Sequence, residues 1–362
     1  MVQTGEITAV IKQAAYDAEF DLVGIAPVRD FSELDHFPKW ITDGYAGEMK
    51  YMEAKDEAGR LKRASLRSAI PWARSVIVCA INYNTAQPYS TQTTDPEKGW
   101  ISRYAWGQED YHDAVMKRLR KVEDRLQQSF MTSERPALQT RRYVDTGPLV
   151  ERVYAKYAGV GWIGKNTCIL NQKLGSWLFL GVILTSLELE PDFPAPDRCG
   201  SCTRCIDACP THALVAPYQL DSNKCISYLT IEKRGSIAEE MRVGMGRHVF
   251  GCDICQDVCP WNRKSPVTSA SEFQPRKGLV NPALEWLAEM TAEEFRETFR
   301  ASPIRRTKHA GLRRNAALAM GNSGDQRFLP VLEKLAADED LIVAEAARWA
   351  AQQLQETSRP EG

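Results

Sequence analysis

The sequence predicts an α+β fold in which an α/β part, a cysteine-rich part and a helical tail follow one another along the chain. Residues 1–190 mix amphipathic helical stretches with apolar strand-like runs, whereas residues 301–362 carry helical patterns only. Between these parts, eight of the ten cysteines fall within one window of about sixty residues. A chain of 362 residues has room for two or three domains.

The α/β part begins with an amphipathic helix near Glu6, and the apolar run SVIVCAINY at 75–83 predicts a strand. A second helix is expected over 113–130, because its apolar residues lie on one face. A third, from Leu149 to Ala158, follows a proline and ends at a glycine. A strand pair then surrounds the turn at Lys173–Gly175.

One glycine motif in this part imitates a nucleotide site. Gly159, Gly161 and Gly164 match the pattern G-x-G-x-x-G. That fingerprint requires a strand before it and a helix after it. Here a helix precedes the motif and the strand TCIL follows it, so we expect a tight backbone turn rather than a dinucleotide site.

The cysteine spacing is that of a protein with two [4Fe–4S] clusters. The first run is C-x2-C-x2-C-x3-C-P, and the second group has one cysteine, a 26-residue gap, and then C-x2-C-x3-C-P. The cysteine before each proline binds the neighbouring cluster in such ferredoxins. The expected ligands are Cys199, Cys202, Cys205 and Cys259 for cluster 1, and Cys209, Cys225, Cys252 and Cys255 for cluster 2. Residues 226–251 are therefore an insertion into a ferredoxin-like domain.

Zinc and disulfides are the alternatives for these cysteines. Zinc sites rarely show this triple spacing, and nothing points to export. Residues 1–20 contain three acids and no apolar core segment, so they do not resemble a signal peptide. We expect a reducing, cytoplasmic location, no membrane association, and buried free thiols at Cys79 and Cys168.

The tail is predicted to contain three helices, at 307–320 (ending at Gly321), 326–337 and 341–355, stacked like HEAT repeats. The net charge of −1 argues against a general nucleic-acid binder. However, residues 301–327 hold six basic residues against one acid, a local balance of +5. Such a run is either a solvated face or a surface for phosphates.

A further candidate is Asp145, which lies just before a helix N-terminus in the segment YVDTGPLVER. A turn aspartate at this place could satisfy free backbone amides. Alternatively, its carboxyl group could act as a general acid toward a substrate that is being reduced.

Four segments together resemble the epoxyqueuosine reductases: DTGPLVER from Asp145, GWIGKN from Gly161, CISYLTIE from Cys225 and GCDICQDVCPWN from Gly251. The resemblance covers nearly the whole chain. It implies four parts: a nitroreductase-like α/β cobalamin-binding core (1–190), a two-cluster ferredoxin-like domain (191–265), connecting helices (266–300) and a HEAT-like tRNA-binding domain (301–362).

The implied reaction is reduction of epoxyqueuosine to queuosine at the wobble position of tRNA anticodons. Electrons would pass from an external donor through both clusters to cobalamin, and Asp145 would give a proton to the epoxide oxygen. His112 lies in DYHDAV, where valine replaces the glycine of the cobalt-binding pattern D-x-H-x-x-G. The resemblance therefore implies base-off cobalamin without a protein histidine ligand, in an enzyme expected to be a monomer.

The resemblance also implies contact residues. The expected cobalamin contacts are Arg63, Asp145, Arg152, Lys165, Asn166, Ser227, Cys252 and Asp253. The expected tRNA contacts are Lys233, Arg234, Arg305, Arg306, Arg313 and Arg314. A cobalamin enzyme of the reductive dehalogenase type and a plain electron-transfer ferredoxin are the alternative functions. The ferredoxin would need neither cobalamin nor Asp145.

Overall fold

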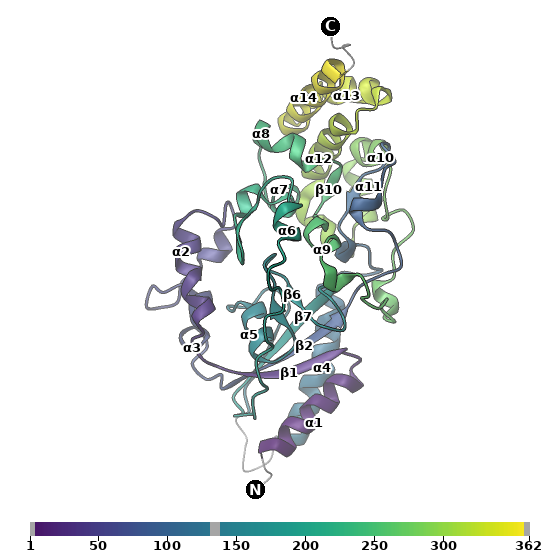
Figure 1. Cartoon of the computed structure of the whole chain (residues 1–362). Helices are drawn as coiled ribbons and strands as arrows, with labels where there is room; N and C mark the ends of the chain where they lie inside the picture. Colours follow the sequence, from purple (N-terminus) through teal and green to yellow (C-terminus); the bar gives the residue numbers. More distant parts are fainter. Residues whose placement is uncertain (1–3, 131–137, 358–362) are drawn as a thin grey trace.

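The computed structural model describes residues 4–130 and 138–357. It is elongated, with the N-terminal sheet at one end and the last helices at the other (Figure 1). The helices are α1 Thr4–Asp17, α2 His36–Thr42, α3 Leu66–Ala69, α4 Tyr111–Phe130, α5 Glu151–Tyr157, α6 Arg204–Asp207, α7 Ile226–Ile231, α8 Glu239–Arg242, α9 Ile254–Asp257, α10 Leu284–Glu289, α11 Ala292–Thr298, α12 Lys308–Ser323, α13 Leu329–Leu335 and α14 Leu341–Thr357. None of the helices in these described ranges combines the length and apolar character needed to cross a bilayer.

The strands are β1 Leu22–Pro27, β2 Ser75–Asn82, β3 Trp100–Ile101, β4 Thr140–Tyr143, β5 Trp162–Ile163, β6 Ile169–Leu170, β7 Leu178–Thr185, β8 Leu214–Ala216, β9 Gln219–Leu220 and β10 His248–Phe250. Four of them form an antiparallel sheet in the order β1-β2-β7-β4. Each of the other three sheets described has two strands: β10-β3, β5-β6 and β8-β9.

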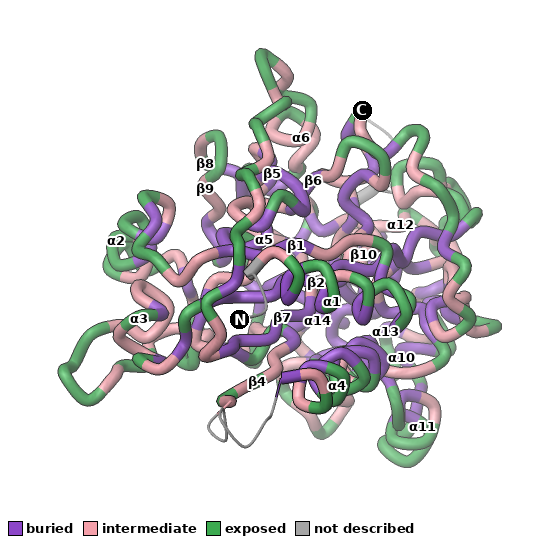
Figure 2. Tube along the Cα trace, turned by 90° about the horizontal axis from the view of Figure 1, so that it is seen from below, coloured by how far each residue is buried: buried purple, intermediate pink, exposed green. Residues whose placement is uncertain are grey.

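The two central strands of the four-stranded sheet, β2 and β7, are largely buried and are mostly purple in Figure 2. Every residue of β2 is buried. Its side chains alternate between two cores: Ile77 and Cys79 pack with α1 and α4, whereas Val76 and Val78 pack with α5. The uninterrupted apolar run in β2 follows from this double covering.

The structure confirms most elements expected for residues 1–190. The strand pair expected around Lys173–Gly175 was wrong, because β6 pairs with β5 while β7 pairs with β2 and β4, and in the described residues only an isolated Asn171–Gly175 bridge closes the turn. Strand β2 and helices α4 and α5 lie within two residues of their predicted ends. The glycine motif follows α5 and leads into the β5–β6 hairpin, so the reversed order is confirmed. Gly161 is needed for close packing there, because a Cβ atom would lie 2.4 Å from the carbonyl oxygen of Leu170.

The insertion between the cysteine groups shares a core with the helical tail. Helices α7 and α8 and strand β10 all come from residues 226–251, and β10 pairs in parallel with β3 of the N-terminal part. Apolar residues of α7 and β10 belong to the same buried cluster as those of α10, α12 and α14. The insertion is therefore packed between the N-terminal part and the tail.

The tail contains its three predicted helices, but the predicted end of the first was wrong. Helix α12 passes through Gly321 and ends before Gly324, whose φ of +72° is the left-handed value that glycine favours. Gly321 is a helix-interior contact, because a Cβ atom there would lie 2.7 Å from Cα of Ala350 in α14. The HEAT-like character of these helices stays a prediction.

We predict that Gly321→Ala lowers the free energy of unfolding by about 1–3 kcal/mol, since the added methyl group forces α12 and α14 apart. Urea unfolding of the full chain measures this. The matched control is Gly235→Ala, where no atom lies within 4 Å of the added Cβ. Alanine by itself favours a helix by about 1 kcal/mol over glycine, so without the close contact the variant would be at least as stable as wild type. Such a result would contradict the contact.

Candidate active site

The eight clustered cysteines form two groups in space. Burial raises the pKa of the Cys205 thiol, and the nearby Cys199 and Cys202 raise it further. Burial also raises the pKa of Cys259 to about 11, with Cys199 and Cys205 as neighbours that add to the shift. Thus Cys259 joins the first run although it lies more than fifty residues further along the chain.

The second group is equally distinct. Burial raises the pKa of Cys225, and the charge of Cys209 adds to the shift. Burial is the main cause that raises the pKa of the Cys252 thiol, and the charges of Cys225 and Cys209 add to the rise. Cys252 and Cys225 are also neighbours of Cys255. These neighbours agree with the two quartets expected from the spacing, which stay a prediction. In the described part of the chain, no three His, Cys, Asp or Glu side chains converge closely enough to hold a single metal ion.

The loop between Cys252 and Cys255 is fixed by Asp253, which is 1% exposed. Its carboxylate accepts hydrogen bonds from the Trp100 indole at 3.0 Å and the Arg103 amide at 2.8 Å. It also accepts one from the Ser102 hydroxyl. Asp253 does not line the cavity described below, so its prediction as a cobalamin contact is corrected to a structural role.

Lys165 also supports a cysteine loop. Its ammonium group donates to the carbonyl oxygens of Gly200 at 2.7 Å and Cys202 at 3.0 Å. It does not line the cavity, so this predicted contact is corrected as well. The adjacent Asn166 does line it, and its Nδ2 donates to the carbonyl oxygen of Cys255 at 3.3 Å.

A cavity of about 590 Å³ lies against the second cysteine group. Its lining includes Cys209, Cys225, Cys252 and Cys255, together with the predicted residues Arg63, Asp145, Arg152, Asn166 and Ser227. Cys168 also lines it, beside Cys255, so only Cys79 is the fully buried thiol that we expected. None of the five histidines of the chain is part of the lining. His112 instead contacts Asp110, with 2.7 Å between Nδ1 and Oδ1.

Asp145 lies between β4 and α5 with its residue exposed. Its φ of +58° is a left-handed value, which is uncommon for a residue with a side chain. Its carboxylate accepts a hydrogen bond from the Tyr111 hydroxyl, and the Tyr111 ring stacks on Phe179 with centroids 4.4 Å apart. Helix α5 is capped at Val150 without a side-chain hydrogen bond, so the structure does not use Asp145 as a helix cap.

Two residues of the cavity were missed by the sequence reasoning. Tyr111 begins α4 next to His112, and only its contact with Asp145 reveals its importance. Glu151 belongs to the motif that contains Asp145, but no spacing rule marked its side chain. Burial raises the pKa of Glu151 to about 7, and the charge of Asp145 adds to that shift.

The predicted basic surface is only partly available. Arg314 is 1% exposed, and its guanidinium donates to the carbonyl oxygens of Leu229 at 2.8 Å and Gly235 at 2.6 Å. Its prediction as a tRNA contact is therefore corrected: it ties α12 to the insertion. Arg313 forms an ion pair with Asp338 of the tail.

The other basic residues remain near the surface. Arg305 and Arg306 are exposed, and Arg306 lines the cavity while pairing with Glu232. Arg234 donates to the carbonyl oxygen of Arg306 at 2.8 Å. Lys233 forms an ion pair with Glu48. These four residues come from the insertion and the start of the tail.

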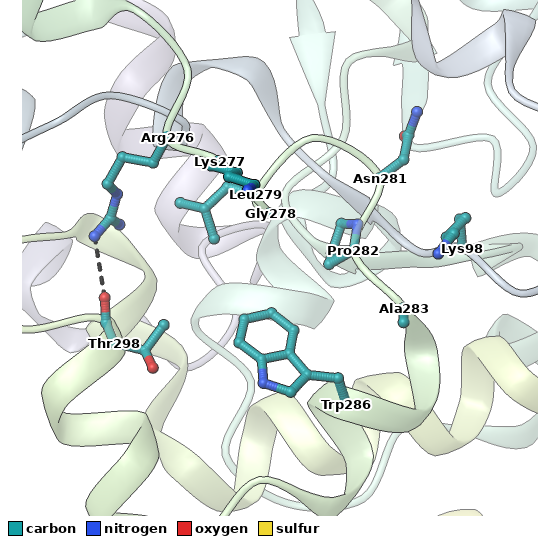
Figure 3. Close-up of a pocket in the computed structure, with 10 residues that line it drawn as sticks. All are labelled: Lys98, Arg276, Lys277, Gly278, Leu279, Asn281, Pro282, Ala283, Trp286 and Thr298. Atoms are coloured by element: carbon teal, nitrogen blue, oxygen red, sulfur yellow. Dashed lines mark hydrogen bonds between the residues drawn. The ribbon is translucent and has the colours of Figure 1, made fainter.

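A second hollow of about 360 Å³ lies beside α10 and α11 (Figure 3). Its walls include Lys98, Arg276 and the half-exposed ring of Trp286. Arg276 donates from Nη1 to the carbonyl oxygen of Thr298 at 3.0 Å. No cysteine of either group lines this hollow, and neither does Asp145, so it is separate from the candidate site.

Comparison with known proteins identifies the family. The model "4Fe-4S double cluster binding domain" matches residues 198–262, and "Epoxyqueuosine reductase QueG, DUF1730" matches residues 63–146. An epoxyqueuosine reductase of Synechocystis is 44% identical over 81% of this chain and 98% of its own length. The chain belongs to the epoxyqueuosine reductase family. It is thus an oxidoreductase with a 4Fe–4S double-cluster domain.

Other members of the family match over nearly their whole length. The epoxyqueuosine reductase of Escherichia coli is 38% identical over 97% of this chain and 90% of its own. A crystal structure of an epoxyqueuosine reductase with an epoxyqueuosine-modified tRNA-Tyr stem loop superimposes with a TM-score of 0.87 and 30% identity, over 97% of this chain and 91% of that one. The mixed helix and sheet fold of this chain is therefore the fold of the family.

We predict that Cys259→Ala removes only the cluster of the first cysteine group, about half of the iron, because Cys259 lies with Cys199 and Cys205. Iron analysis and electron paramagnetic resonance of the anaerobically purified protein measure this. Cys79→Ala, in strand β2 and packed in the core with α1 and α4, serves as the control and should keep both clusters. Loss of both clusters, or of neither, from folded Cys259→Ala protein would contradict the grouping.

Proposed function

We propose that this chain reduces epoxyqueuosine to queuosine at the wobble position of a tRNA anticodon. The observation that carries the proposal is the cavity, because it joins the exposed carboxylate of Asp145 to the four thiols of the second cysteine group. A structurally similar reductase binds an epoxyqueuosine-modified stem loop, which supports tRNA as the substrate. An electron-transfer ferredoxin would leave both Asp145 and the cavity without a role.

We further propose that each cysteine quartet holds one [4Fe–4S] cluster. The first is bound by Cys199, Cys202, Cys205 and Cys259, and the second by Cys209, Cys225, Cys252 and Cys255. Such clusters carry one electron at a time. The loop at residues 200–204 is mostly exposed, so an external donor can approach the first quartet.

Cobalamin is the group that we propose for the cavity. The cavity is large, is lined by apolar side chains with several polar and charged ones among them, and adjoins the second cysteine quartet. Arg63, Arg152, Asn166, Ser227 and Cys252 would contact it, and the lack of a lining histidine suits the base-off form without a protein ligand. When bound, cobalamin supplies a strongly reducing centre for opening the epoxide.

Asp145 would serve as the proton donor. Opening an epoxide leaves negative charge on oxygen, and a carboxyl group close to that oxygen stabilises the transition state by protonating it. The hydrogen bond from the Tyr111 hydroxyl orients the Asp145 carboxylate, and stacking on Phe179 holds the Tyr111 ring in place. With two electrons from the external donor and a second proton, the oxygen then leaves as water and the alkene of queuosine forms.

The tRNA would approach over Lys233, Arg234, Arg305 and Arg306. Arg306 is at once exposed and part of the cavity wall, so it is suited to hold a phosphate next to the reacting nucleotide. The modified base must leave its stack to reach the cavity. Contacts with phosphates hold the RNA without reading its sequence, and they weaken as salt rises.

Asp145→Asn should slow product formation by roughly 10²–10⁴-fold, because the amide cannot donate the proton, while iron and cobalamin contents stay unchanged. Anaerobic assay of tRNA from cells that accumulate epoxyqueuosine measures the rate. The control is Asp113→Asn on the exposed face of α4. Normal turnover by Asp145→Asn would rule out this role.

Replacing Arg305 and Arg306 together by glutamine should weaken tRNA binding and make it less dependent on salt, since two phosphate contacts are lost. Binding isotherms at several salt concentrations measure both effects. Lys334→Gln on α13, whose side chain pairs with Glu289, is the control. If the salt dependence of the double variant equals that of wild type, these arginines do not contact phosphate.

A further inference from the structure

Reduction of an epoxide to an alkene consumes two electrons and two protons: both C–O bonds break, a C=C bond forms, and the oxygen leaves as water. A single carboxyl group can supply only one proton at a time. We infer that Glu151 stores the second proton and passes it to Asp145, so that one carboxyl group protonates the oxygen twice. This inference rests on the proposed function.

The position of Glu151 suits such a relay. It is the first residue of α5, six residues after Asp145, and both residues line the same cavity. Its Oε1 atom is buried and has no hydrogen-bond partner among the described residues. Burying an unpartnered ionised carboxylate costs far more than burying the neutral carboxyl group, so burial favours the protonated form.

The neighbouring arginines do not neutralise this carboxyl group. Arg152 donates to the carbonyl oxygen of Thr167 at 2.9 Å, and Arg63 donates to that of Tyr51 at 3.0 Å. In residues 4–130 and 138–357, no ion pair joins either arginine to Glu151. Glu151 is therefore not held as the ion-pair partner of either arginine.

The electrostatics agree with a protonated Glu151. Burial is the largest effect and raises its pKa to about 7, and the negative charge of Asp145 adds to the rise. Its own backbone amide, Arg63 and Arg152 lower the pKa by less. Besides Asp145, Arg63 and Arg152, the titratable and charged groups of the cavity wall are Arg306, the thiols of Cys168 and of the second cysteine quartet, and the phenols of Tyr51, Tyr83, Tyr104 and Tyr111. At neutral pH, Glu151 thus exchanges its proton readily.

The protons can be followed through the reaction. As the first C–O bond breaks, the proton of Asp145 moves to the oxygen and leaves a hydroxyl group. Glu151 then transfers its proton to the Asp145 carboxylate. Asp145 protonates the hydroxyl group, which departs as water when the second C–O bond breaks. The two electrons come from the external one-electron donor, and solvent reprotonates both carboxylates after product leaves.

The test is a single turnover of a modified stem loop by the reduced, cobalamin-loaded enzyme, at pH values on either side of 7. The wild-type rate should fall about tenfold per pH unit above the pKa of Glu151. Glu151→Gln should be roughly 10²-fold slower and lose that inflection, and Glu151→Asp should recover part of the rate. Glu333→Gln, exposed on α13, is the matched control. A wild-type rate and pH profile in Glu151→Gln would overturn the inference.

A second measurement does not depend on turnover. The pKa of Glu151 is raised on folding, so its contribution to stability is present at low pH and is lost as pH rises through about 7. As pH rises from about 4.5 to about 7, the melting temperature of Glu151→Gln should therefore rise relative to that of wild type. Infrared difference spectra below pH 7 should show a protonated carboxyl band that the variant lacks. A constant difference in melting temperature and no such band would overturn the inference.

These outcomes are separable from failure of the proposed function. If the loaded wild-type enzyme forms no queuosine, the proposed function fails, whatever the spectra of Glu151 show. If the wild type is active while Glu151→Gln matches it at every pH, only the relay fails.

Discussion

The buried carboxylate of Asp253 is the interaction on which the arrangement of the site depends. It lies between two cysteines of the second quartet, and all its hydrogen-bond donors belong to the segment Trp100–Arg103 of the N-terminal part. The Arg103 guanidinium is also buried, and it donates to Thr85, at 2.8 Å for the carbonyl oxygen. This network holds the cysteine loop against the N-terminal part, so that its thiols face the cavity that Asp145 also lines. An unsatisfied carboxylate at this depth would be strongly destabilising.

The insertion at 226–251 links that cavity to the tail. Helix α7 begins directly after Cys225, and Arg314 and Asn315 of α12 donate to the carbonyl oxygens of α7 residues Leu229 and Thr230, at 2.8 and 2.9 Å. Consequently, the four basic residues proposed to meet tRNA are held in a fixed relation to the cysteine quartet. A cysteine pattern that would otherwise belong to a small electron carrier here forms one wall of the cavity that we propose for the reaction.

The sequence predicted patterns of spacing well and the direction of individual side chains poorly. Strand β2 follows from an unbroken apolar run, so it could be predicted, and ligand spacing likewise predicts how the cysteines are grouped. Arginine usually lies at the surface, and Arg314 is buried because its guanidinium donates to a backbone carbonyl group of α7. Gly321 looked like a helix end because its packing partner, Ala350, lies in another helix. Asp253 is held by a segment that lies far away in the sequence, and Glu151 stands out only because its side chain is buried. No local motif records either feature.

We propose that the cavity beside Cys209, Cys225, Cys252 and Cys255 is the site of cobalamin and of epoxide reduction. Electron paramagnetic resonance of the partly reduced enzyme, titrated with cobalamin, tests this directly. Cobalt(II) should broaden the signal of the second cluster through spin coupling, and this coupling should persist in Cys259→Ala protein lacking the first cluster. Cluster signals that are unchanged by bound cobalamin, or coupling that disappears with the first cluster, would contradict it.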